Sequence, residues 1–278
     1  MPRGVGLNWR YDEARLQGRL WTPALLRPSL WLDASDISTI TVSSGVSEWR
    51  DKSGNGRHAA TAVRQPILSF NVQNSLSAIT FTASSATKLD TPVFSIAPNR
   101  EFCSFGVVSG AGLVAPASTY PRIWGTLGGG DSAGGGSTYP QGFFGGGPAN
   151  GTAMLIAGGT GVTQPQVTSL PTNQAVLLTG RFGTAGQSAN TSSISAFGGT
   201  ISSLASQTGA LSTSGIRIGA DVGTSSVSAW NSWIGEIILT TGISLAQSMV
   251  VEGYLSWKWG VRLVASHPFA NRPPLIGD

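Results

Sequence analysis

The residues that could perform chemistry are few, and the first group to test is a serine among glycines. Gly130-Asp131-Ser132-Ala133-Gly134 fits the pattern G-x-S-x-G, in which a serine nucleophile lies on a sharp turn between a strand and a helix. The run Gly134-Gly135-Gly136 follows, and glycine is a poor helix former. His58 and His267, the only histidines that could serve as the base, lie in no recognisable triad context. We therefore expect no catalytic residue here.

The acidic residues argue against hydrolysis of glycosides. That reaction uses two carboxylates aimed at one glycosidic bond, and in jelly-roll glucanases they stand on one strand as E-x-D-x-E or E-x-D-x-x-E. None of the 13 acidic residues forms such a triplet. The nearest pairs, Asp33 with Asp36 and Glu48 with Asp51, are three residues apart and would point to opposite faces of a straight strand. We predict that the protein is not an enzyme.

Histidine and cysteine offer no spacing for a metal site, because two histidines far apart and the single Cys103 cannot surround an ion. Cys103 alternates with Phe105 and Val107 and is expected to be a small core residue. Calcium stays open as the one cofactor alternative, since it takes carboxylate and carbonyl oxygens. Its candidate ligands are Asp33, Asp36 and Asp51. The competing interpretation is that Asp51 and Asn55 simply build turns.

The positive charge is concentrated at one end of the chain. Residues 1–28 carry a net charge of +3 out of the chain's +4, whereas only Arg122, Asp131 and Arg181 are charged between Phe102 and Ile216. A nucleic-acid surface needs lysines and arginines aligned along a groove, so we expect no nucleic-acid partner. The basic segment is instead interpreted as an anchoring arm. Its candidate contact residues are Arg3, Trp9, Arg10, Arg15, Arg19 and Trp21.

From Ser29 onward the sequence is typical of an all-β protein, with short apolar runs separated by Gly, Asn, Ser and Pro. These runs predict strands of a β-sandwich or jelly roll. The expected strands are Ser29–Leu32, Val46–Trp49, Ile67–Phe70, Ala78–Phe81, Phe102–Ser109, Arg122–Leu127, Thr152–Ala157, Ala175–Phe182, Ser193–Phe197, Ile216–Ala220 and Trp233–Thr240. The last is apolar on both faces, which places it in the middle of a packed structure.

One long helix is expected, over residues 245–259. Ser244 is a suitable N-cap and Gly260 a suitable left-handed residue after the helix. A proline-rich tail follows. We therefore divide the chain into a basic N-terminal arm, residues 1–28, and one jelly-roll domain, residues 29–278, that includes this helix and tail.

Aromatic residues suggest a binding surface. Trp31, Trp49, Trp233, Trp257 and Trp259 lie in apolar periodic runs and are expected in the core. Others lie beside Gly, Ser or Pro, where an exposed ring could stack on a sugar or dock into a protein pocket. These candidate glycan-binding residues are Tyr120, Trp124, Tyr139, Phe143, Phe144 and Trp230. The alternative, that they cover the core or an oligomer interface, is equally compatible with their surroundings.

Two blocks of sequence resemble the concanavalin A-like (laminin-G-like) lectin/glucanase jelly rolls of phage and bacterial surface proteins. The first block is Leu30-Trp31-Leu32-Asp33-Ala34-Ser35-Asp36 with Val46-Ser47-Glu48-Trp49-Arg50-Asp51-Lys52-Ser53-Gly54-Asn55-Gly56. The second is Ile234-Gly235-Glu236-Ile237-Ile238 with Val251-Glu252-Gly253-Tyr254-Leu255-Ser256-Trp257-Lys258-Trp259-Gly260 and Ser266-His267-Pro268. The resemblance implies a last core strand, a capping helix and a tail.

The run Leu20-Trp21-Thr22-Pro23-Ala24-Leu25-Leu26 is similar to the lead-in of phage-encoded members of this family. The resemblance therefore implies a structural protein of the phage virion: a head decoration, fibre or tail-associated protein, homo-oligomeric and bound to other virion proteins. We expect assembly in the host cytoplasm and a place on the virion surface, since no signal peptide and no membrane-inserting stretch is recognised. The alternative is an adhesin module that binds host surface polysaccharide, and a glycoside hydrolase ranks third.

Overall fold

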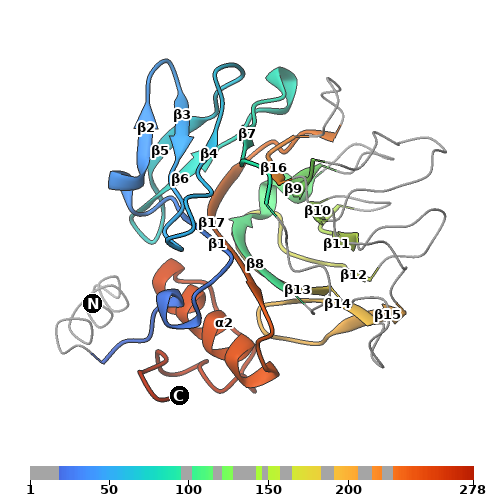
Figure 1. Ribbon diagram of the computed structural model, residues 1–278. Coiled ribbons are helices and arrows are strands. Elements are labelled where there is room, and N and C mark those ends of the chain that lie inside the picture. The colour runs from blue at the N-terminus through green and yellow to red at the C-terminus, as the bar shows by residue number, and fades with distance from the viewer. Residues whose placement is uncertain are drawn as a thin grey trace, which may run out of the picture.

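The protein is a jelly-roll β-sandwich of the concanavalin A-like type with one C-terminal helix, as seen in a computed structural model (Figure 1). The structure describes residues 19–94, 102–114, 121–127, 142–145, 150–156, 165–182, 191–205, 215–220 and 228–278. Two antiparallel sheets face each other, and the helix α2 (Leu245–Trp259) lies on the outside of one of them. The fold class expected from the sequence is thus confirmed.

The sheet that α2 covers, here the helix-side sheet, has the order β15-β14-β13-β8-β17-β6-β5, with β1 also paired to β17. Its long central strands are buried along nearly their whole length, as expected for strands covered on both faces. The bounds are β1 (Leu30–Asp33), β5 (Ile67–Gln73), β6 (Leu76–Thr80), β8 (Phe102–Ser109), β13 (Ala175–Phe182), β14 (Thr191–Ala196), β15 (Ser202–Ala205) and β17 (Trp233–Thr241).

The second sheet, here the outer sheet, has the order β12-β11-β10-β9-β16-β7-β4-β3-β2. Its strands are short because turns interrupt them, and several of the shortest were not expected from the sequence. The bounds are β2 (Ile40–Val42), β3 (Val46–Trp49), β4 (Ala59–Ala60), β7 (Leu89–Asp90), β9 (Arg122–Thr126), β10 (Gly142–Gly145), β11 (Ala153–Ile156), β12 (Gln166–Val167) and β16 (Ile216–Ile218). Every strand expected from the sequence has a counterpart in one of the two sheets.

Helix α2 begins and ends where its sequence requires. The Ser244 side chain accepts a hydrogen bond from the Gln247 amide, and the Gln247 side chain accepts one from the Ser244 amide, which completes a capping box. Gly260 closes the helix with φ of +65°. Short 3-10 turns occur elsewhere: η1 (Pro23–Leu26), η2 (Ile37–Thr39), η3 (Ala83–Ser85) and η4 (Gly110–Leu113).

The core between the sheets corrects one prediction about tryptophan. Trp124 and Trp230 were expected as exposed glycan-binding residues, but only 1% and 0% of their surfaces are exposed. Trp124 donates its Nε1–H to Ser104 Oγ and packs on Phe102, so its polar edge is satisfied inside the sandwich. Gly125, beside Trp124, lies within β9 and marks no turn, and packing between the two sheets buries both rings.

A β-bulge in β17 determines which side chains reach the helix. The register of β17 against β8 shifts between Ile234 and Glu236, which adds one residue at Gly235. Glu236 and Ile238 therefore face α2, whereas Ile234 and Ile237 face the core between the sheets. Strict alternation along the strand would place Ile237 on the same face as Trp233, but alternation does not continue through a bulge.

The last ten residues of the expected arm belong to the folded domain. Leu20 forms an isolated bridge with Leu275, and the Trp21 amide donates to the Pro274 carbonyl. The Trp21 ring is buried and meets Tyr254 of α2 edge-on at 5.9 Å between ring centroids. Trp21 is thus a packing residue of the folded domain, and the contacts of residues 19–28 place this stretch in the domain and not in the arm predicted to end at residue 28. Arg19 is exposed, whereas Arg3, Trp9, Arg10 and Arg15 lie outside the described residues.

Gly219 is predicted to be intolerant of a side chain. Its φ is +85°, and an added Cβ would lie 2.0 Å from Cδ1 of the buried Phe81. Gly219→Ala should lose about 1–2 kcal/mol through backbone strain and about 1–3 kcal/mol more through overpacking. Gly54→Ala is the matched control, because Gly54 has φ of +86° and nothing within 4 Å of the added Cβ. Urea unfolding of both variants measures the difference, and equal losses would contradict the packing argument.

Candidate functional site

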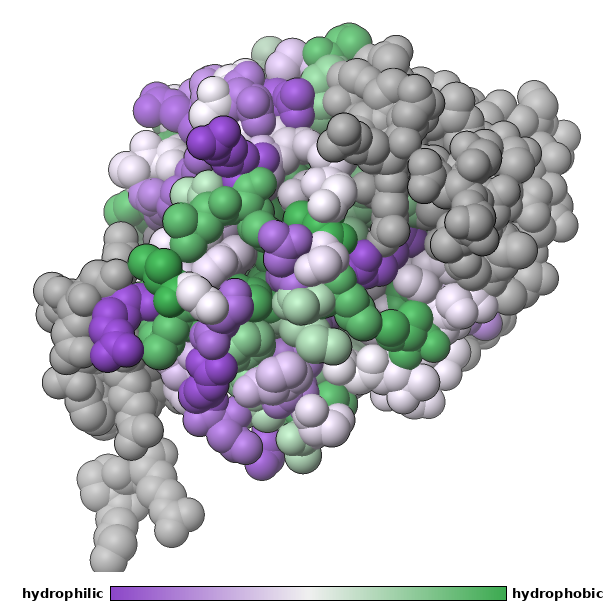
Figure 2. Space-filling view, turned by 60° about the horizontal axis from the view of Figure 1, so that its bottom comes forward, coloured by the Kyte–Doolittle hydropathy of each residue, from purple (hydrophilic) through white to green (hydrophobic). Residues whose placement is uncertain are grey.

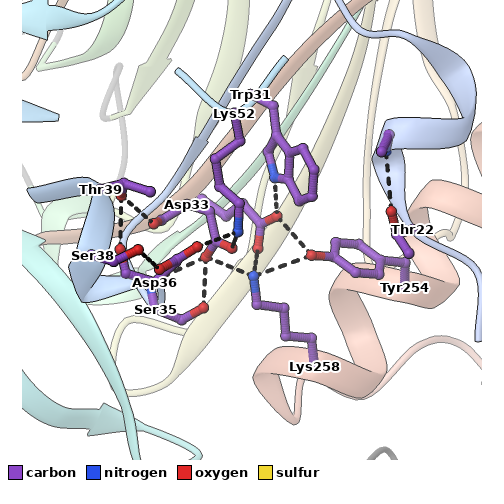
Figure 3. A network of polar contacts seen from close by, with 12 residues as sticks. Thr22, Trp31, Asp33, Ser35, Asp36, Ser38, Thr39, Lys52, Tyr254 and Lys258 are labelled. Carbon is purple, nitrogen blue, oxygen red and sulfur yellow. Dashed lines mark hydrogen bonds and ion pairs between the residues drawn. The ribbon is translucent and has the colours of Figure 1, made fainter. Parts of the chain in front are cut away.

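The two blocks that carry the family resemblance meet in one buried network of charges. Asp33 on β1 and Glu236 on β17 are register partners, so their side chains leave adjacent strands on the same face. Helix α2 supplies Lys258, and the loop after β3 supplies Lys52. Figure 3 shows Lys258 reaching from the helix toward Asp33, while Lys52 approaches from the opposite side.

Glu236 accepts four hydrogen bonds, two on each carboxylate oxygen. Oε1 receives the indole N–H of Trp31 at 2.7 Å and the hydroxyl of Tyr254 at 3.2 Å. Oε2 receives Nζ of Lys258 at 2.7 Å and the indole N–H of Trp259 at 2.8 Å. Glu236 is fully buried, so these donors replace water around its charge. Trp31 and Trp259, both expected in the core, therefore also satisfy a buried carboxylate, together with Tyr254.

Asp33 joins the same network through two ammonium groups. Lys258 lies 2.6 Å from Oδ1 and Lys52 lies 2.8 Å from Oδ2. Lys52 also pairs with Asp36 at 2.8 Å and lies over the Trp31 ring, 4.6 Å from its centroid. The result is a chain of alternating charges that ties β1, β17, α2 and the loop after β3 together.

Burial and the neighbouring charges move the two pKa values in opposite directions. Burial alone would raise the pKa of Asp33, but the ammonium groups of Lys258 and Lys52 outweigh it and hold that pKa well below its ordinary value. Burial raises the pKa of Glu236 above its ordinary value, although Lys258 opposes this rise. Asp33 is therefore the carboxylate that stays charged under all ordinary conditions.

The oxygens proposed as calcium ligands are engaged by protein donors. Asp33 and Asp36 share Lys52, so an ammonium group occupies the position a cation would take. Asp51 accepts from the amide of Trp31 at 3.0 Å and from groups of its own loop, including the Arg57 amide. No cluster of three or more His, Cys, Asp or Glu residues that could hold a metal occurs in the described part of the chain. Asp51 acts as the turn builder of the competing interpretation.

A second buried polar cluster lies between α2 and β13. Glu252 of α2 accepts from the hydroxyl of Thr179 at 2.6 Å, and its other oxygen lies 3.0 Å from Nε2 of His267. Nδ1 of His267 accepts from the Phe269 amide, so Nε2 carries the proton that bonds Glu252. His267 therefore fastens the C-terminal tail to the helix. Ser132 lies outside the described residues.

A groove lies at the C-terminal end of α2. Its volume is about 360 Å³, within the range of about 300–1,000 Å³ typical of small-molecule sites. Four segments far apart in sequence form its walls, through Gln73 at the end of β5, Gln174 before β13, Phe197 after β14 and the run from Gly260 to Val264. These residues were not predicted as a site, because the four segments are far apart in sequence and only the fold brings them together.

The remaining predicted site residues divide into two groups. Tyr120 and Tyr139 lie outside the described residues. Phe143 and Phe144 lie on β10, opposite Leu155 and Met154 of β11, but only their backbone is described. The glycan-binding hypothesis for these four residues stays a prediction.

Acid is expected to weaken the fold through Asp90. Burial would raise the pKa of Asp90, but ion pairs with Arg217 at 2.6 Å and Lys88 at 2.7 Å hold it below its ordinary value. A carboxyl with a lowered folded-state pKa stabilises the protein above its unfolded pKa of about 4 and loses that stabilisation as the pH falls. The melting temperatures of wild type and Asp90→Asn should therefore converge between pH 5 and pH 2.5. A constant difference would contradict this pairing.

Comparison with known proteins identifies the fold. No family model matches the chain, and no curated protein matches it in sequence. Domain 4 of a GH43 extracellular arabinanase from Geobacillus stearothermophilus, solved with arabinotriose, has a TM-score of 0.53 at 13% identity over 79% of this chain and 95% of that chain. The binding domain of botulinum neurotoxin serotype D has a TM-score of 0.50 at 10% identity over 82% and 51%.

A Trypanosoma rangeli sialidase, solved with 2,3-difluorosialic acid, has a TM-score of 0.50 at 13% identity over 77% of this chain. The match covers only 30% of the sialidase.

No helix in the described ranges is long and apolar enough to cross a membrane. At these identities the likenesses establish architecture alone, and the chain is a concanavalin A-like jelly-roll sandwich.

Proposed function

We propose that the protein is a non-enzymatic structural protein of a phage particle, in which residues 1–18 attach to the particle and the sandwich is presented to the surroundings. The observation that carries this proposal is the path of residues 19–28. They are bound to residues 274–276 and to the face of α2, so the chain enters the sandwich at a fixed point (Figure 1). In this proposal, attachment belongs to the segment before residue 19 and presentation to the sandwich.

The buried network supports a role without catalysis. Glycoside hydrolysis needs two carboxylates open to the substrate. Asp33 and Glu236 stand on adjacent strands, but they are 2% and 0% exposed and their oxygens are occupied by lysine, indole and hydroxyl donors. The residues that give the chain its family resemblance therefore hold the sandwich together. The phage assignment rests on the similarity of the lead-in at residues 20–26 to phage-encoded members of the family.

The test is the composition of purified particles. Mass spectrometry of particles from cells that express the encoding phage should detect the full chain in many copies, as expected of a homo-oligomeric virion component. Antibodies raised against the folded domain should decorate intact particles in electron micrographs. Particles without the protein, or with the protein accessible only after disruption, would overturn the proposal.

A carbohydrate-binding module is the second candidate, and the groove at the end of α2 favours it. Exposed amide and guanidinium groups beside an aromatic ring are the components of a sugar site. The arabinanase domain with the same fold was solved with an oligosaccharide, which shows that such a sandwich is compatible with sugar binding. A glycan array at physiological salt tests this candidate, and the absence of any bound glycan would remove it.

A further inference from the structure

The groove at the C-terminal end of α2 presents polar groups that the protein does not use. Arg262 is exposed and has no ion pair or hydrogen bond to any described residue. The side chain of Gln174 is exposed and likewise unpaired within the described ranges. Gln73 donates its Nε2–H to the Trp259 carbonyl at 2.9 Å, which orients the amide and leaves Oε1 for another partner. The groove is therefore lined by the guanidinium group of Arg262 and the side-chain amides of Gln174 and Gln73.

The groove also contains an aromatic residue held in an unfavourable backbone conformation. Phe197 has φ of +56°, a region that bulky residues rarely occupy, and it is only partly buried. Two hydrogen bonds hold it there, from its amide to the Leu177 carbonyl and from the Val264 amide to its own carbonyl. Strain of this kind persists only where the surroundings enforce it, and it is found preferentially at binding sites.

The charge of the groove indicates the class of ligand. Arg262 is the one ionisable residue among those that line it. A guanidinium group binds a carboxylate through two parallel hydrogen bonds, while glutamine amides match hydroxyl groups and an aromatic ring matches the apolar face of a sugar. Figure 2 shows hydrophilic and hydrophobic side chains interspersed on the face of the molecule that it turns toward the viewer.

From these contacts we infer that the groove binds a sugar residue that carries a carboxylate, as part of an acidic surface polysaccharide. Arg262 would hold the carboxylate, Gln174 and Gln73 the hydroxyl groups, and Phe197 the ring. This inference rests on the carbohydrate-binding candidate and does not depend on attachment to a particle.

The experiment is a titration of the full chain, followed by isothermal calorimetry and by ligand-observed NMR. The probes are 3′-sialyllactose and trigalacturonic acid, with lactose as the neutral control. At least one acidic probe should bind with a dissociation constant in the millimolar range or below, and lactose should not bind at the same concentrations. Higher ionic strength should weaken binding because the contact is partly ionic.

Matched variants separate the groove from the rest of the surface. Arg262→Gln should weaken binding at least tenfold. Arg262→Lys should weaken binding less, because lysine keeps the positive charge but cannot form the two parallel hydrogen bonds of a guanidinium group. Gln174→Ala should also weaken binding. Arg50→Gln is the control, since the Arg50 side chain is 52% exposed and lies in the loop after β3. Absence of binding to both acidic probes, equal binding of lactose, or binding unaffected by Arg262→Gln would overturn the inference. If glycans on the array still bind the Arg262→Gln variant, the groove is not the binding site, but the protein is still a carbohydrate-binding module.

Discussion

Lys258→Met is expected to lower the free energy of unfolding by about 3–5 kcal/mol, the loss typical of a broken buried ion pair. Lys258 contacts Asp33 at 2.6 Å and Glu236 at 2.7 Å, and its side chain is only 10% exposed. Methionine fills a similar volume but brings no charge, so both carboxylates stay buried with one ammonium group fewer. The penalty is the desolvation of those charges, which water cannot reach to relieve.

Chemical denaturation of three variants measures this effect. Arg50→Met is the control, because Arg50 and Glu48 form an exposed pair worth about 0–1 kcal/mol. Lys52→Met should fall between the two, since Lys258 still pairs with Asp33 in that variant. If Lys258→Met yields no folded protein, the other two variants still test the network, because Lys52→Met should lose more free energy of unfolding than Arg50→Met. Equal losses at Lys258 and Arg50 would show that the network contributes nothing.

Deletion of residues 1–18 is expected to remove the protein from particles and to leave the sandwich as stable as before. The deletion ends before Arg19, where the contacts with residues 274–276 begin. The prediction is a fall in copies per particle of at least tenfold, with an unchanged melting temperature. Full incorporation of the shortened protein would contradict the anchoring role, whereas a lowered melting temperature would show that these residues also stabilise the domain.

A longer deletion, to residue 28, is expected to damage the fold. It removes Trp21, which is 6% exposed and packs edge-on against Tyr254 of α2. Loss of a buried tryptophan costs about 3–5 kcal/mol. Comparison of the two deletions by thermal denaturation therefore locates the start of the folded domain, and equal stability would contradict the packing of Trp21.

Local patterns predicted the secondary structure well, because the features they depend on are local. Ser244 and Gly260 set the ends of α2 through contacts within one turn, and uninterrupted apolar runs such as Phe102–Ser109 became central strands. The bulge at Gly235 was not predictable. It arises where β17 pairs with β8, and only the sheet shows that the alternation of side chains changes there.

The sites were less predictable, because they depend on distant segments. The acidic residues Asp33 and Glu236 were visible in the sequence, but their pairing across two strands follows from the sheet register. Trp124 and Trp230 have polar or glycine neighbours that suggested exposure, and the packing of two sheets buries them. The groove near Phe197 combines four segments, so no single stretch of the sequence indicates it.

The most direct test of separate attachment and presentation is whether the attaching segment works without the sandwich. Residues 1–18 fused to a fluorescent protein should co-purify with particles assembled in cells that lack the full chain, and the fluorescent protein alone should not. Fluorescence per particle gives the number of attached copies. Particles that carry the full chain but never the fusion would show that the sandwich itself makes the attachment, which contradicts the account.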